Sequence, residues 1–268
     1  MRFERIRAIT RGAIVLGMLL PLIPLLIWSV SFRWYFPDML PEMWSLRAWR
    51  YVFAPSSRVL PALGYSVGVA TAVTLLSLVI SIPAGRALGL YRFRGKTAVQ
   101  FLILAPTIVP AIAVAMGIHV AFIYYGLSDT LPGVILVHLI PVMPYLVLIL
   151  ASTFANYNVD YEGQARTLGA NQWQIFWHVT LPIIFPGLIV GSLFAFIISW
   201  SQYLLTLLIG GGQVITLPIL LFSFANSGDH PITAALSIVF IAPAILFLLF
   251  TSRYLTGEQA AIGGIGKL

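Results

Sequence analysis

The sequence of 268 residues contains no cysteine and few charged side chains. The absence of cysteine excludes disulfide bonds, thiolate metal sites and cysteine nucleophiles. Charged residues make up 9% of the chain and hydrophobic residues 60%, whereas soluble domains carry roughly 25% charged residues. A soluble protein of this length could not cover so much apolar side chain with a solvated polar coat. The composition therefore predicts a membrane protein.

The charges that are present lie outside the long apolar runs. The net charge of +7 could suggest a nucleic-acid partner, but the basic residues form short clusters between apolar runs instead of following one face. No carboxylate lies within an apolar run, so a proton relay or a sodium site would have few ligands. The runs also hold no Ser/His/Asp or metal-ligand grouping. We therefore expect no nucleic-acid partner, no catalysis and no metal site.

Two segments resemble the end of a phosphate-binding loop, but neither has the full pattern. Gly95-Lys96-Thr97 would need a glycine at position 90, which is Leu90. Gly266-Lys267 is followed by Leu268, where the pattern needs Ser or Thr. We therefore expect no nucleotide site in this chain.

Six apolar runs are long enough to cross a membrane, since a spanning helix needs roughly 20 apolar residues. The first run follows a basic amino terminus but has no small-residue cleavage pattern, so we expect a retained helix instead of a cleaved signal. The chain is thus expected to be an all-α membrane protein with about six transmembrane helices in a single domain, residues 1–268. The expected spans are 12–32, 62–85, 98–123, 131–153, 182–208 and 232–252.

The placement of Lys and Arg predicts the orientation, because cytoplasmic loops carry an excess of both. With the amino terminus inside, the inner segments would hold the basic clusters in 2–11 and 86–96 together with Arg166, Arg253 and Lys267. We therefore expect a multi-pass protein of a bacterial-type inner membrane with both termini in the cytoplasm. Of the 15 Lys and Arg residues, those expected outside are Arg33, Arg47, Arg50 and Arg58, which Asp38 and Glu42 offset only in part.

Prolines recur within the expected spans, and each removes a helical hydrogen bond. In a membrane this is tolerated where a bend or a neighbouring helix satisfies the freed carbonyl. The prolines are either ordinary kinks that help the helices pack, or, at Pro106/Pro110 and Pro141/Pro144, bends around a cavity.

The segment from about 156 to 181 is too polar to span a membrane. Asn158 or Asp160 can cap a short helix, and Glu162 and Arg166 would lie on one of its faces at a favourable i, i+4 spacing. Gly169 stands where such a helix would end in a left-handed residue. A second amphipathic turn would lie at the membrane interface before Pro182 begins the next span. The segment is either a protrusion for a cytoplasmic partner or a loop that merely joins two helices.

This segment resembles the signature loop of binding-protein-dependent ABC importer permeases. The family pattern is Glu-Ala-Ala, three residues, Gly, nine residues, Ile, one residue and Leu-Pro. Gly163-Gln164-Ala165, Gly169 and the run 179–182 (Val-Thr-Leu-Pro) keep this spacing. The chain departs from the pattern at Gly163 and Gln164, although the acidic Glu162 stands one residue earlier.

The resemblance implies a type I ABC importer permease fold with a short cytoplasmic coupling helix at about 160–169. Such a chain forms half of a solute pore and has neither enzyme activity nor a cofactor. Its implied partners are a sister permease, a dimer of ATP-binding subunits that carries the ATP and Mg, an external solute-binding protein and membrane lipid. The residues implied to contact the ATPase are Glu162, Gln164, Ala165, Leu168 and Gly169.

Two further segments resemble the polyamine, thiamine, ferric-iron and phosphonate branch of these permeases. They are YRFRGK (91–96) and ITLPILLFSF (215–224). The resemblance implies a small solute of one of these kinds and a role as the second of two non-identical pore subunits. A sugar importer permease is the alternative, and a stand-alone secondary transporter is a more distant one.

Some polar side chains lie within the expected spans. His138, like His119, either serves the transport path or forms a neutral hydrogen bond to a neighbouring helix. Gln202 and Tyr203 either line the path or join helices and the aromatic belt at the outer interface. The candidate path residues are thus His138, Gln202 and Tyr203.

Overall fold

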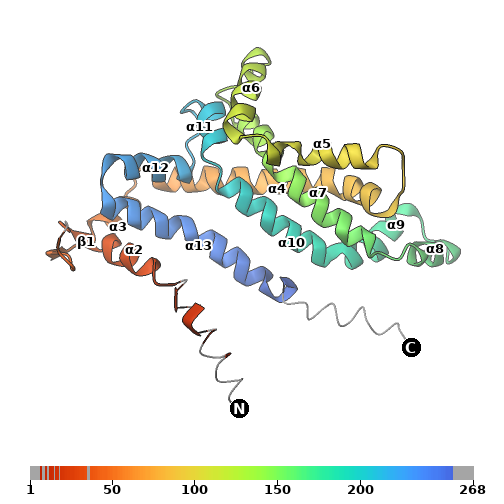
Figure 1. Cartoon of the computed structure of the whole chain (residues 1–268), viewed down its shortest axis with the longest axis horizontal. Coiled ribbons are helices and arrows are strands. Elements are labelled where there is room, and N and C mark those ends of the chain that lie inside the picture. Colours follow the sequence, from red (N-terminus) through yellow and green to blue (C-terminus); the bar gives the residue numbers. More distant parts are fainter. Residues whose placement is uncertain are drawn as a thin grey trace. The chain divides into compact units, whose positions relative to one another are not determined.

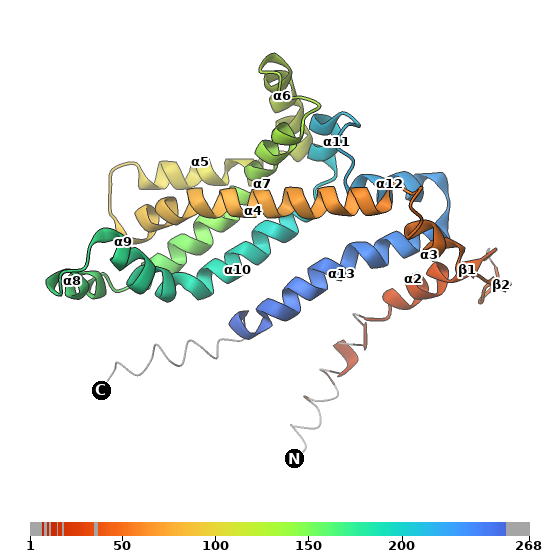
Figure 2. The ribbon, with the colours of Figure 1, turned by 180° about the vertical axis from the view of Figure 1, so that it is seen from behind.

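The computed structural model describes residues 7, 10, 12–14, 16, 17, 19–34 and 37–255, and Figures 1 and 2 show it from opposite sides. The described residues fall into two compact units. Those in 1–64 and 216–243 are called the hairpin unit, and those in 65–215 and 244–268 the bundle unit. Two helices, α4 (Val59–Leu90) and α13 (His230–Leu255), have residues in both units.

Four helical stretches among the described residues are long and apolar enough to cross a membrane. They are α4, α7 (Leu131–Ala155), the continuous stretch Gln172–Trp200, and α13, in which the apolar part is His230–Phe247. A bent pair of helices would make a fifth span. The expected span 12–32 includes positions 15 and 18, which lie outside the described residues; its described part includes α2 (Leu22–Ser29).

The expected span 98–123 is two helices, α5 (Lys96–Ile108) and α6 (Ala111–Tyr124), bent by 101°. The break lies at Pro110, and the preceding Val109 has an extended backbone with ψ 138°. A residue before proline is driven out of the helical region, and proline has no amide to continue the ladder. Pro106, Pro141 and Pro144 lie inside continuous helices. The bend that the sequence allowed at Pro106/Pro110 thus lies at Pro110, and 98–123 makes one span if the bent pair is counted together.

The hairpin unit contains elements that hydropathy did not predict. Strands β1 (Ser31–Phe32) and β2 (Met43–Trp44) pair antiparallel, with Ser31 opposite Trp44. They are followed by the short helix α3 (Arg47–Val52), and α12 (Leu217–Ser227) is apolar but too short to span. Buried residues of this unit include Val52, Leu217 and Leu236.

In the bundle unit, α7 packs against both α4 and α10 (Leu181–Trp200). Two pairs of glycines, each spaced four residues apart, allow this close approach. A Cβ at Gly85 or Gly89 of α4 would lie 2.6 Å from α7 atoms, and one at Gly187 or Gly191 of α10 would meet Thr153 or Leu146 of α7. The buried core between these helices includes Leu146, Leu150, Phe154 and Ile184.

The bundle has two differently built ends (Figures 1 and 2). At the loop end lie α8 (Asp160–Thr167), α9 (Gln172–Ile175) and the π-helix η1 (Phe176–Thr180). At the far end lie α6 and α11 (Leu204–Gly210). The candidate site is at the loop end.

Candidate functional site

The segment 156–181 forms the short polar helix that its sequence predicts. α8 begins at Asp160, whose amide donates to Asn158 Oδ1 at 2.9 Å. Asp160 and Glu162 lie in its first turn and Arg166 in its last, where each charge opposes the helix dipole favourably. Gly169 follows with φ +85°, a left-handed conformation that disfavours any residue with a Cβ. The chain therefore turns sharply at Gly169, as expected.

A second helix leads from this turn into the next span. Asn171 and Gln174 form a reciprocal capping box at the start of α9. The helix then continues through the π turn of η1 into α10, so Pro182 lies within the stretch Gln172–Trp200 instead of starting a new helix. Trp173 and Trp177 are exposed on this lead-in, as suits a membrane interface.

The exposed end of α8 presents several of the predicted contact residues. Gln164 and Gly169 are exposed, Ala165 is half-buried, and Leu168 is 88% exposed. A groove of about 440 Å³ lies beside them and is lined by Ala165, Leu168, Gly169, Ala170, Gln174, His178 and Val179.

The Glu162 side chain points toward α4, away from the exposed end of α8. Its residue is 2% exposed, and its carboxylate accepts two parallel bonds from the Arg86 guanidinium of α4, Nη1 to Oε1 at 2.7 Å and Nη2 to Oε2 at 2.9 Å. This two-point geometry is the strongest form of Arg–carboxylate pairing. Within this chain, Glu162 is thus an internal contact and not part of the exposed end of α8.

Three further groups surround the same carboxylate. The Tyr157 hydroxyl donates to Oε1 at 2.9 Å and the Thr180 hydroxyl to Oε1 at 3.2 Å, while Arg166 Nη2 lies 3.5 Å from Oε2. The hydrogen bond from Arg86 holds the pKa of Glu162 down at about 2, against the opposing effect of burial. Burial raises the pKa of Tyr157 above its ordinary value of 10.0. At neutral pH the site therefore holds a carboxylate and a neutral phenol.

His138 lies within the helix packing of the bundle. It is 1% exposed, with Nδ1 2.9 Å from Ser199 Oγ of α10 and Nε2 2.9 Å from Thr206 Oγ1 of α11. Because the Thr206 hydroxyl donates to the carbonyl of Gln202 at 3.0 Å, its oxygen is left to accept from Nε2–H. The geometry matches a neutral histidine that joins three helices.

The other intramembrane candidates lie at the far end. His119 Nε2 is 3.1 Å from Ser128 Oγ. Gln202 and Tyr203 are half-buried in a break between α10, which ends at Trp200, and α11. The expected span 182–208 therefore ends earlier than its hydropathy suggests, because the helix is interrupted at 201–203. A role of Gln202 and Tyr203 in the path stays a prediction.

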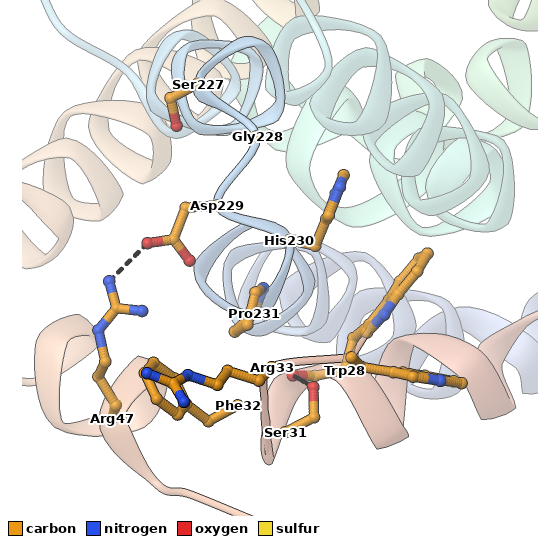
Figure 3. Close-up of a pocket in the computed structure, with 11 residues that line it drawn as sticks. Trp28, Ser31, Phe32, Arg33, Arg47, Ser227, Gly228, Asp229, His230 and Pro231 are labelled. Carbon is orange, nitrogen blue, oxygen red and sulfur yellow. Dashed lines mark hydrogen bonds and ion pairs between the residues drawn. The ribbon is translucent and has the colours of Figure 1, made fainter. Parts of the chain in front are cut away.

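The hairpin unit contains an aromatic pocket of about 290 Å³ that sequence reasoning did not select (Figure 3). Arg47, one of the arginines expected outside, is paired with Asp229 at 2.6 Å. The guanidinium carbons of Arg33 and Arg47 lie 5.6 and 5.9 Å from the centre of the Phe32 ring, and Trp28 stacks on His230. Arg47 is thus held by an acid and by an aromatic ring, and Arg33 contacts the same ring.

Comparison with known proteins identifies the family. The family model for "Binding-protein-dependent transport system inner membrane component" matches residues 81–256. The chain belongs to this family. The matched range includes both α8 and Arg86, so the candidate site lies in the part of this permease that its family shares. It is a subunit of an ABC importer and a multi-pass protein of the inner membrane.

Two curated relatives are similar over most of this permease. The molybdenum transport system permease protein ModB of Mycobacterium tuberculosis is 31% identical over 218 residues, covering 76% of this chain and 81% of the relative. The 2-aminoethylphosphonate transport system permease protein PhnV of Salmonella typhi, named as putative, is 28% identical over 236 residues, covering 87% and 88%. Both relatives are transport permeases, as the sequence analysis expects.

One solved structure confirms the predicted fold. It is a chain of a bacterial ABC transporter involved in the import of the acidic polysaccharide alginate, with a TM-score of 0.74. The identity is 20%, and the match covers 94% of this permease and 96% of that chain. The likeness concerns the fold alone.

Proposed function

We propose that this permease forms half of the solute pore of an ATP-driven importer and docks its ATPase partner on the exposed end of α8. The observation that carries the proposal is the placement of Leu168, 88% exposed at the Gly169 turn of a polar helix outside the apolar spans. A leucine in this position gains about 2 kcal/mol when a partner removes it from water.

The neighbouring residues suit the same contact. Gln164 is exposed and can exchange hydrogen bonds with a partner. Ala165 is small and half-buried beside the groove, so a partner's backbone can approach closely. Gly169 supplies the turn that brings Leu168 to the tip.

The proposed orientation places α8 in the cytoplasm. The loop end carries Arg86 and Arg166, and the adjacent connection carries Arg92, Arg94 and Lys96, as expected of the inner side. Both termini are then cytoplasmic, and the first loop, with Arg33, Arg47, Arg50 and Arg58, lies outside, where a solute-binding protein would dock. The exposed apolar faces of α4 and α5, such as Val79 and Leu102, suit contact with a sister permease and lipid.

In this proposal the chain performs no chemistry. The partner ATPase dimer carries ATP and Mg, and its closure moves α8, which changes the helix packing between inward-open and outward-open states. Solute from the binding protein would pass between the two permeases. Gln202 and Tyr203 offer uncharged hydrogen bonds along such a path.

The proposed solute is small, of the polyamine, thiamine, iron or phosphonate kind. The segments 91–96 and 215–224 and the 28% identity with a permease named for 2-aminoethylphosphonate support this branch, while the 31% identity with a permease named for molybdenum adds an oxyanion to the candidates. A sugar is the alternative. Titration calorimetry of the cognate solute-binding protein with each solute class would decide between them.

The substitution Gly169→Asp tests the docking surface. It strains a left-handed turn and puts a charge beside Leu168. The matched control is Gly126→Asp, because Gly126 is also left-handed (φ +66°), exposed and without neighbours around its Cβ, but lies at the far end.

We expect Gly169→Asp to abolish co-purification of the ATPase subunit from solubilised membranes and Gly126→Asp to retain it. Retained assembly and transport in Gly169→Asp would overturn the docking proposal. Equal loss in both variants would also count against it, because the effect would then not be local to α8.

A further inference from the structure

At the loop end, a single carboxylate connects four segments of the bundle unit. Glu162 belongs to α8, Arg86 to α4, Tyr157 to the connection after α7, and Thr180 to η1. Oε1 accepts three hydrogen bonds, and Oε2 accepts one from Arg86 with Arg166 close by. A carboxylate has about four acceptor positions, so this one is already fully used within the chain.

The same carboxylate is the main attachment of α8. The structure describes every residue of α8, and Glu162 is the buried one among them. The remaining residues are exposed or half-buried. A force applied to the exposed end of α8 therefore reaches the bundle through the Glu162 carboxylate, in addition to the chain on either side of the helix.

Arg86 links the Glu162 carboxylate to two spans, α4 and α7. It lies in the last turns of α4, and its guanidinium carbon is 5.9 Å from the centre of the Phe154 ring of α7. Phe154 is fully buried in the bundle core. A displacement of Glu162 thus acts on α4 directly and on α7 through a cation–π contact.

The helices on both sides of this joint contain an irregular position close to it. Pro83 lies inside α4 three residues before Arg86, and Thr180 is the last residue of the π-helix. Helices bend where a proline or a π turn breaks the regular ladder. A cavity of about 720 Å³, whose lining includes Ile82, Pro83, Arg86, Glu162 and Thr180, lies beside the joint and leaves room for such a movement.

From these observations we infer that Arg86 and Glu162 are positioning residues for energy coupling: they transmit the movement of α8 to α4 and α10, and Glu162 does not itself bind the ATPase. This inference rests on the proposed function. It assigns separate roles to the two sides of α8, since the exposed end binds and the buried carboxylate transmits.

The test compares assembly with coupling in the complete importer reconstituted in lipid vesicles. The variants are Glu162→Gln, Arg86→Lys, which keeps the charge but loses the two-point geometry, and the charge exchange Arg86→Glu with Glu162→Arg. The measurements are co-purification of the ATPase, ATP hydrolysis, and solute transported per ATP hydrolysed.

We expect Glu162→Gln to bind the ATPase normally and to hydrolyse ATP. The amount of solute transported per ATP should fall about tenfold, a factor within the range that coupling between two sites typically spans. Arg86→Lys should retain more coupling than Glu162→Gln, and the charge exchange should recover part of it. Transport per ATP within twofold of the native value in Glu162→Gln would overturn the inference. So would loss of ATPase binding in Glu162→Gln, because Glu162 would then be a docking residue.

The result for Gly169→Asp separates this inference from the proposed function. If that variant still assembles, α8 is not the docking helix and the proposed function fails. If it loses the ATPase while Glu162→Gln stays coupled, docking on α8 stands and only the role of the buried pair is wrong. Should Glu162→Gln not accumulate in membranes, the charge exchange decides, since recovery of accumulation without coupling contradicts the inference.

Discussion

The two ends of the bundle unit are held together by different chemistry. At the loop end a charged pair, Arg86 and Glu162, joins α8 to α4. At the far end the joints are neutral: His138 binds Ser199 and Thr206, and the Asp129 amide donates to the Ile209 carbonyl at 2.7 Å. Charge is costly at membrane depth, so helices there are joined by neutral groups. A buried ion pair also adds little net stability compared with apolar packing, whereas removing one partner is strongly destabilising.

The largest effect is expected from breaking the charged joint on one side. Arg86→Met leaves the Glu162 carboxylate buried without its main partner, which lowers the free energy of unfolding by about 3 kcal/mol. Thermal unfolding of the purified protein in detergent measures this as a lower midpoint. The double variant Arg86→Met with Glu162→Leu should recover most of the stability but not the coupling, and a double variant as unstable as Arg86→Met would contradict this view.

The same joint predicts a pH dependence. The pKa of Glu162 is held at about 2, below its ordinary value of 4.5, so the ionised pair stabilises the fold above about pH 4.5 and loses this contribution as the pH falls through about 2. The stability difference between the native protein and Arg86→Met should therefore be constant at neutral pH and shrink in acid. Thermal unfolding from pH 7 down to the lowest pH the detergent tolerates measures it, and a constant difference would disprove the assignment.

A smaller effect is expected from the glycine contacts that lead away from the loop end. A Cβ at Gly89 would lie 2.6 Å from both the Ala151 carbonyl oxygen and Phe154 Cβ, neither of which can move without shifting a helix. A Cβ at Gly191 would meet only the rotatable tip of Leu146 closely. Gly89→Ala should cost about 2 kcal/mol and Gly191→Ala less than about 1 kcal/mol. Thermal midpoints check the order, and the reverse order would mean that α4 and α7 are less closely packed than α7 and α10.

The smallest effect is expected at the neutral joint. His138→Leu removes two interhelical hydrogen bonds, each of which contributes about 0.6 kcal/mol in membrane proteins, so we expect a loss of about 1 kcal/mol with solute transported per ATP unchanged. Ser199→Ala is the control for one of the two bonds. A loss of transport in His138→Leu at normal stability would instead favour the path role that the sequence left open.

Local features were the ones that the sequence could predict. The helix at 160–167 and the turn at Gly169 depend on capping, dipole and backbone preferences within a few residues, and both are confirmed. Four of the expected spans overlap long apolar helices for the same reason. Composition and short-range pattern are enough for such elements.

Features that depend on distant contacts could not be predicted. Arg86 and Glu162 are 76 positions apart. The family resemblance implied an ATPase contact for Glu162, and no local pattern could have indicated its pairing with Arg86. Pro110 breaks a helix, whereas Pro144 lies inside one. Proline chemistry is identical at both, so the surrounding packing decides. An arginine directly after an apolar run was the one signal that could have directed attention to Arg86.

The π turn between α9 and α10 has a consequence for insertions and deletions. Each residue added to or removed from a continuous helix rotates everything beyond it by about 100°. Because η1 runs without a break into α10, the length of 172–180 sets the direction in which α9, and before it the Gly169 turn, faces. Surface connections usually tolerate a change in length. Here a deletion of one residue in α9 would rotate the start of that helix by about 100°, whereas a deletion within η1 can be absorbed, because a π turn holds one residue more than a regular α turn.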